Sequence, residues 1–122
     1  MDRVRESAMQ GLEASRETLV NRISKELGLV CFSSVPDSLL MWAHYCDSHQ
    51  GFVVGFNTKN PFFMSLKRFQ EVDYSKDRPQ INHGDDDLAE IDKQMFKVCF
   101  TKSLEWAYER EWRTSFLLSS LI

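Results

Sequence analysis

The sequence lacks most of the short motifs by which enzymes and metal proteins are recognised. It contains no His-x-x-x-His spacing, no Gly-rich phosphate loop, and no serine or cysteine in the setting of an activated nucleophile. Cys31, Cys46 and Cys99 are far apart and show no Cys-x-x-Cys spacing, which disfavours a disulfide framework and a zinc site. We therefore expect no metal site, and hydrolase, metalloenzyme and P-loop functions rank low.

The chain also lacks a surplus of positive charge and any long apolar run. Its formal net charge is -3 and its pI is near 5.6, which disfavours a surface that neutralises many phosphates of a nucleic-acid duplex. No apolar run approaches the ~20 residues of a membrane-spanning helix, and residues 1–6 lack the apolar core of a signal peptide. These features predict a cytoplasmic protein that binds neither membranes nor duplex nucleic acid.

What the chain does contain is a composition typical of one small folded domain. Its 122 residues are 43% hydrophobic, 12% aromatic and 27% charged. Apolar residues recur about every four positions over residues 1–27, which predicts a leading amphipathic helix. Gly28 follows at the position of a helix C-terminal cap. We expect residues 28–122 to form a single α+β domain.

Strand and helix patterns follow each other irregularly along residues 28–122. Runs of β-branched and aromatic residues predict strands at residues 29–33 (buried), 52–56, 70–75 and 113–118, with a further short one near 64–67. Helical spacing predicts helices over residues 39–46, capped by Asp37 or Ser38, and from 88 to about 103. Because strands and helices do not alternate strictly, we predict an α+β fold with a small mixed sheet, mostly antiparallel, packed by about three helices.

Two dense polar-aromatic clusters hold much of the remaining chemistry. The first is Met-Trp-Ala-His-Tyr at residues 41–45, and the second is Trp-Ala-Tyr-Glu-Arg-Glu-Trp-Arg at residues 106–113. Such clusters line pockets or form buried polar networks. We expect them to meet in space, because separate burial would leave several polar groups unpaired. The expected contacts join His44 or Tyr45 to Glu111 or Arg113, directly or through one water.

The two clusters belong to a longer series of short sequence motifs. The series is Cys31-Phe32-Ser33, residues 41–45 with His49 and Gly51, Val72-Asp73-Tyr74, Lys102, and residues 106–113. In order and spacing it resembles the bacterial family named domain of unknown function 2971, from about residue 30 to residue 116. Family members usually begin with a tyrosine-rich strand and an Asn-Asp-Pro turn, and nothing of that kind precedes Val30. The resemblance therefore covers the central and C-terminal part of the family domain and implies a partial member.

Glu111 is the sharpest catalytic candidate. We expect it at the start of the last strand, where neighbouring cations favour the ionised carboxylate and aromatic walls limit water. A His-Tyr word followed far downstream by a strand-borne Glu is similar to ADP-ribosyltransferase folds, in which His and Tyr hold nicotinamide dinucleotide and the Glu acts on the ribose. This similarity implies a substrate-binding set around Glu111, namely Trp42, His44, Tyr45, Trp106, Tyr108 and Arg113.

Two functions from different classes remain open. In the first, the chain is an ADP-ribosyltransferase-like toxin or phage-defence effector with Glu111 catalytic and NAD, a small-molecule nucleotide, as substrate. In the second, it is a non-catalytic binding or structural module in which a buried His-Tyr-Glu-Arg network fixes helix against sheet. A chain without the upstream part of the family domain would also expose an apolar edge, which predicts self-association or a partner strand.

Overall fold

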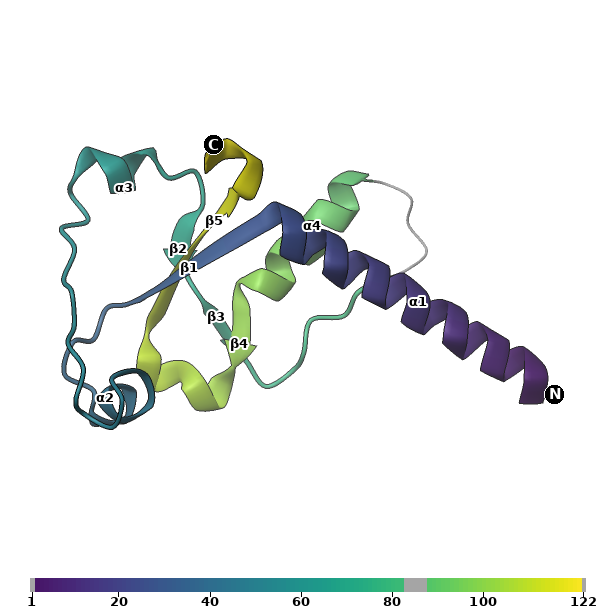
Figure 1. The fold of residues 1–122 in the computed structure, drawn as a ribbon, viewed down its shortest axis with the longest axis horizontal. Helices are drawn as coiled ribbons and strands as arrows, with labels where there is room; N and C mark the ends of the chain where they lie inside the picture. Colours follow the sequence, from purple (N-terminus) through teal and green to yellow (C-terminus); the bar gives the residue numbers. More distant parts are fainter. Residues whose placement is uncertain (1, 83–87, 122) are drawn as a thin grey trace. The chain divides into compact units, whose positions relative to one another are not determined.

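A computed structural model describes residues 2–82 and 88–121 (Figure 1). The helices are α1 (Asp2–Glu26), α2 (Leu39–Tyr45), α3 (Pro61–Ser65) and α4 (Leu88–Cys99), with 3-10 helices η1 (Leu104–Glu109) and η2 (Leu118–Leu121). The strands are β1 (Leu27–Ser33), β2 (Phe69–Glu71), β3 (Asp73–Ser75), β4 (Thr101–Ser103) and β5 (Glu111–Leu117). In the described part of the chain, no helix has both the length and the apolar character to cross a membrane.

The strands form two small sheets. One has three strands in the order β1-β5-β2, with β2 antiparallel to β5 and Gln70 opposite Arg113. The other is a parallel pair, β3 and β4, in which Tyr74 lies opposite Lys102. These arrangements confirm the predicted α+β fold with a small, mostly antiparallel sheet and several helices.

The chain divides into two compact units, and the first consists of Met1–Gly28 and Ser115–Ile122. The leading segment forms the helix α1, with Val4 exposed and Ile23 half-buried; the side chains of Leu12 and Leu19 lie outside the described part. The prediction that Gly28 caps α1 is wrong, because Gly28 already belongs to β1. A Cβ at Gly28 would stand 2.5 Å from the Phe116 ring, so glycine permits this close approach.

The second unit, Leu29–Thr114, is built around a small aromatic core. The Phe63 ring lies within 5.8 Å of the rings of Phe32, Phe56 and Phe69, edge to face with Phe32 and tilted against the other two. Phe69 in turn packs against Trp112 of β5, with 5.1 Å between ring centroids. This core holds β1, β2 and β5 together and leaves the polar ends of these strands free to build a site.

Two predicted strands are wrong, because local residue composition does not determine the structure of these segments. Residues 52–56 form no regular element, since none of the strands in the described ranges pairs with them. The strand predicted near residues 64–67 falls largely on α3. Asn60 caps this helix by accepting a hydrogen bond from the Phe62 N–H at 3.0 Å, and Pro61 occupies its first turn.

Further details of the strands and helices differ from the prediction, including the start of the last strand, which is Glu111 rather than Arg113. The strand expected at residues 70–75 is split at buried Val72, whose N–H donates to the Glu111 carbonyl at 2.9 Å. The helix expected to reach about residue 103 ends at Cys99, because residues 101–103 pair with β3 instead. The strand expected to be buried at residues 29–33 is β1, but Leu29 and Val30 are 41% and 39% exposed.

Candidate functional site

The corner between η1 and β5 brings two carboxylates together. η1 ends at Glu109, and Arg110 adopts a left-handed backbone conformation with φ 42° before β5 begins at Glu111. The carbonyl of Arg110 accepts hydrogen bonds from the backbone N–H and the hydroxyl of Ser34, at 3.1 and 3.2 Å. This corner turns the side chains of Glu109 and Glu111 toward the same cation, Lys102 of β4.

The two buried carboxylates and two half-buried cations form an ion network. The Lys102 ammonium donates to Oε2 of Glu109 and, at 3.0 Å, to Oε2 of Glu111. Arg113 donates from Nε to Oε1 of Glu111 at 2.7 Å and from Nη2 to Oε2 at 3.1 Å. Glu109 and Glu111 are only 2% and 6% exposed. The formal charges of the four groups cancel, as burial of charge requires.

The same network ties helices to strands. Nη1 of Arg113 donates to the carbonyl of Cys99, the last residue of α4, at 2.6 Å. The Tyr45 hydroxyl, at the end of α2, donates to Oε1 of Glu109 at 2.8 Å. The ion network therefore fixes α2 and α4 to β4 and β5.

The pairing governs the protonation of its members. Burial opposes the ionised form of Glu111, but hydrogen bonds from Arg113, Cys31 and Lys102 outweigh it and lower the pKa of the carboxyl to about 2. Burial likewise disfavours the Lys102 cation, but hydrogen bonds to Glu109 and Glu111 raise its pKa above the ordinary value. Glu111 and Lys102 are therefore both ionised at neutral pH.

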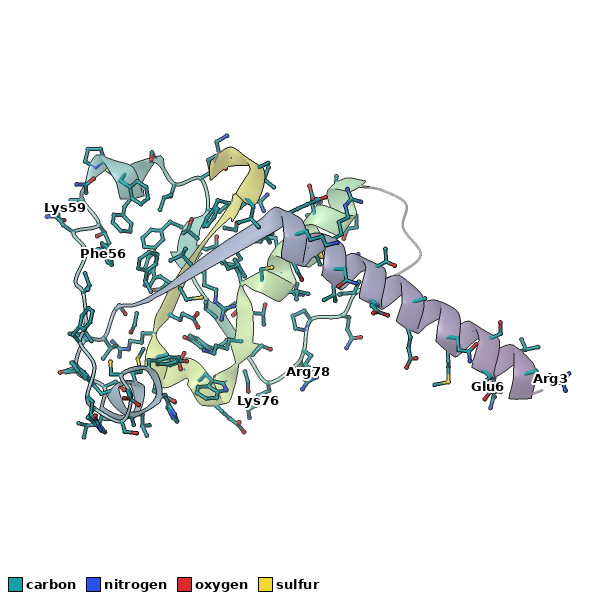
Figure 2. The ribbon with its side chains drawn as sticks, in the orientation of Figure 1. Arg3, Glu6, Phe56, Lys59, Lys76 and Arg78 are labelled. Atoms are coloured by element: carbon teal, nitrogen blue, oxygen red, sulfur yellow. The ribbon has the colours of Figure 1, made fainter. Side chains whose placement is uncertain are left out.

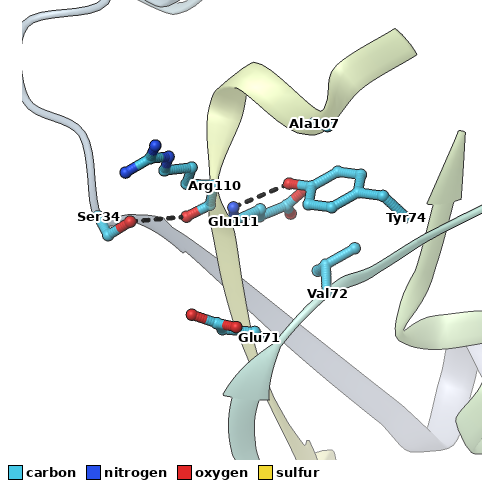
Figure 3. A pocket seen from close by; sticks show the side chains of 7 residues that line it. All are labelled: Ser34, Glu71, Val72, Tyr74, Ala107, Arg110 and Glu111. Carbon is cyan, nitrogen blue, oxygen red and sulfur yellow. Dashed lines mark hydrogen bonds between the residues drawn. The ribbon is translucent and has the colours of Figure 1, made fainter. Parts of the chain in front are cut away.

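A pocket of about 340 Å³ opens beside this network (Figure 3). Its lining comes from the end of β1, from β2 and β3, and from the η1–β5 corner, and consists of Ser34, Glu71, Val72, Tyr74, Ala107, Arg110 and Glu111. The side chains of Arg110 and Glu71 are both exposed. Neither forms an ion pair with any residue that the structure describes. The pocket thus offers an unpaired cation and an unpaired carboxylate.

Tyr74 adds a hydrogen-bonding group to the pocket. Its hydroxyl oxygen accepts the backbone N–H of Glu111 at 2.8 Å (Figure 3). Burial is the main cause that raises the pKa of Tyr74, so the phenol keeps its proton. Within the described residues that proton has no acceptor, and it is available to a ligand.

Comparison of the sequence with known proteins places the chain in a family. A family model described as Protein of unknown function (DUF2971) matches residues 41–114, which is more than half of the chain. The chain belongs to this family. The resemblance predicted from the sequence words is confirmed, and the matched residues include the whole ion network. No curated protein and no solved structure matches the chain.

In this DUF2971 chain the two polar-aromatic clusters lie together. Tyr45 reaches Glu109 rather than Glu111, and the His44 ring lies 6.0 Å from the Trp106 ring, edge to face. Trp106 also contacts the Tyr108 ring at 6.1 Å and the Lys102 ammonium at 5.1 Å. Of the residues predicted to bind substrate, Trp42 lies apart from these contacts, and its indole N–H donates to the Pro36 carbonyl at 2.8 Å.

The sequence prediction misses two members of the network and six of the seven residues that line the DUF2971 pocket, all except Glu111. Glu109 and Lys102 were absent from the predicted site, although both fall in the family words. Arg110 was absent as well. Alternation along extended backbone places Glu111 and Arg113 on one face of β5, but it gave no signal for Glu109, which ends η1, or for Lys102, which lies on β4.

Proposed function

We propose that the chain is a binding module for a small phosphorylated molecule of the size of a sugar phosphate or mononucleotide. The observation that carries the proposal is Arg110, which lines a pocket of about 340 Å³ and whose guanidinium has no ionic partner among the described residues. Arginine forms bidentate, charge-assisted hydrogen bonds with phosphate. The pocket volume lies near the lower end of the roughly 300 to 1,000 Å³ typical of ligand sites.

The backbone of Arg110 supports a functional role for its side chain. A non-glycine residue with φ 42° carries strain that glycine would avoid. Strain of this kind persists where the surrounding structure or the function requires the residue. The turn itself needs only two backbone groups of residue 110: an N–H that donates to the Ala107 carbonyl and a carbonyl that accepts from the Ser34 N–H. Glycine supplies both groups. The arginine side chain therefore serves something other than the turn.

The other lining groups fit the remainder of such a ligand. The Ser34 and Tyr74 hydroxyls and the Glu71 carboxylate offer a mixture of donors and acceptors, which suits the hydroxyl groups of a sugar. Glu111 has both oxygens engaged by Arg113 and Lys102, so it holds the corner in place rather than contacting ligand directly. Binding would thus rest on Arg110 and its neighbours, with the ion network as their support.

The proposal is tested by calorimetric titration of ribose 5-phosphate and of inorganic phosphate into the wild-type chain and into Arg110→Gly. We expect Arg110→Gly to weaken ribose 5-phosphate binding by about tenfold or more, since one charge-assisted bidentate contact is lost. The same variant should raise the free energy of unfolding by about 0.5 to 1 kcal/mol, because glycine relieves the left-handed strain. Weaker binding by a more stable protein cannot be ascribed to unfolding.

The matched control is Arg78→Gly, which removes an exposed arginine from the loop after β3, outside the pocket lining (Figure 2). It should leave the affinity for ribose 5-phosphate unchanged. If the wild type binds neither probe, or if both arginine variants bind as the wild type does, the proposal fails.

A second candidate is an ADP-ribosyltransferase-like activity on NAD, with Glu111 as the catalytic carboxylate. It is favoured by one observation, that Glu111 lines the pocket and is ionised, with a pKa of about 2. In that case Glu111→Gln should stay folded while cleavage of the nicotinamide–ribose bond of NAD falls by orders of magnitude. The two candidates therefore differ in what Glu111→Gln does to stability.

A further inference from the structure

The segment at residues 52–56, Phe-Val-Val-Gly-Phe, is apolar and exposed. It runs between α2 and α3 without a turn or bend (Figure 1). Phe52, Val53, Val54 and Phe56 are between 51% and 82% exposed. Within the described residues no backbone hydrogen bond reaches the amides or carbonyls of residues 53–56. The segment therefore presents both apolar side chains and unpaired backbone groups to solvent.

Both ends of this segment are held in place. At its start, the N–H groups of Gln50 and Gly51 donate to the Cys46 carbonyl, each at 2.8 Å. At its end, Phe56 sets its ring edge-on to Phe32 with centroids 5.7 Å apart, and the chain then turns before Lys59 (Figure 2). A segment anchored at both ends loses little conformational freedom when it binds, so it is organised in advance for a partner.

We propose that residues 52–56 pair as an antiparallel strand with the same segment of a second copy of the chain. Unpaired backbone groups flanked by apolar side chains are satisfied by another strand, which supplies hydrogen bonds and apolar contacts together. Residues 50–58 carry no charged side chain, so two copies meet without like-charge repulsion. The uncharged sequence is what favours a second copy over a charged partner.

The segment is also complementary to itself. A two-fold axis at Val54 sets Phe52 of each copy opposite Phe56 of the other and places Val53 beside Gly55. Nothing lies within 4 Å of the Cβ position of Gly55, so space is open there for the branched side chain. Self-pairing thus sets the Phe52 ring of one copy against the Phe56 ring of the other, and Val53 against Gly55, which has no side chain.

Sedimentation equilibrium tests the pairing. The wild-type chain should form a reversible dimer. Val54→Lys and Val54→Glu should each raise the dimer dissociation constant by about tenfold or more, because like charges face each other across the two-fold axis. Val54 is 58% exposed, so both variants should keep the circular dichroism of the folded chain. An equimolar mixture of the two variants should associate better than either alone, since opposite charges then meet.

The matched control is Val20→Lys, which introduces the same charge at a valine 52% exposed on α1. It should leave the dimer intact. A wild type that stays monomeric at every concentration overturns the proposal, and so does a dimer that Val54→Lys does not weaken or that only Val20→Lys dissociates. A mixture that associates no better than its components overturns the two-fold register.

Discussion

At the scale of single residues, Glu111 stands where the sequence indicates but among different partners. Its place at the start of a strand and its pairing with Arg113 follow from the alternation of side chains along β5. Its contact with Lys102 could not be predicted in the same way, because it depends on how β4 is positioned by pairing with β3. Local patterns thus identified the residue, whereas non-local pairing decides its environment.

Thr114 of β5 offers a test of burial at one residue. Its hydroxyl is buried and has no hydrogen-bond partner among the described residues. Thr114→Val keeps the shape and removes this unsatisfied group, so we expect the free energy of unfolding to rise by about 1 kcal/mol. Urea denaturation measures the change. Thr101→Val is the control, because the Thr101 hydroxyl donates to the Lys97 carbonyl at 2.6 Å and its loss should not stabilise the chain. Equal effects at both sites would contradict this account.

At the scale of elements, the capped helix α2 was predictable, whereas the capped helix α3 and the strand pairing were not. Ser38 caps α2 as expected, with its hydroxyl oxygen accepting from the Met41 N–H at 3.4 Å. Residues 52–56 and 70–75 both have strand composition, yet the first pairs with nothing described and the second is divided between two sheets. A strand needs a neighbour, and sequence composition alone does not specify one.

The junction between α4 and β4 depends on Phe100. This residue is 3% exposed, stacks on Phe96 with centroids 4.4 Å apart, and accepts the Asp73 N–H on its carbonyl at 2.8 Å. Phe100→Ala should lower the free energy of unfolding by about 3 to 5 kcal/mol, because it opens a cavity where helix meets strand. Phe52→Ala, at an 82% exposed ring, should change it by only about 0.5 kcal/mol. Denaturant melts in which Phe52→Ala costs as much as Phe100→Ala would refute this assignment of the core.

At the scale of the whole molecule, the neutral ion network predicts how stability depends on pH. The pKa of Glu111 is lowered from 4.5 to about 2, so its stabilising contribution is present above pH 4.5 and is lost as the pH falls toward 2. The pKa of Lys102 is raised above 10.5, so its contribution is present below pH 10.5 and is lost as the pH rises through the raised value. Stability should therefore fall at both extremes of pH.

Urea denaturation over a series of pH values checks this dependence. Between pH 4.5 and 2 the wild-type chain should lose stability more steeply than Glu111→Gln, because the variant has no carboxyl to protonate at this position. The gap in unfolding free energy between the two proteins should narrow across that range. Parallel curves would show that Glu111 does not contribute to the acid transition.

The central claim is that Glu111 is a counterion within the fold and that the ligand contact is made by Arg110. The most direct test is the free energy of unfolding of Glu111→Gln at neutral pH. We predict a loss of about 3 to 5 kcal/mol, because Arg113 and Lys102 would keep their half-buried charges without a full partner. Glu71→Gln, at an exposed carboxylate of the same pocket, should change it by only about 0.5 kcal/mol. A Glu111→Gln protein as stable as the wild type would contradict the claim.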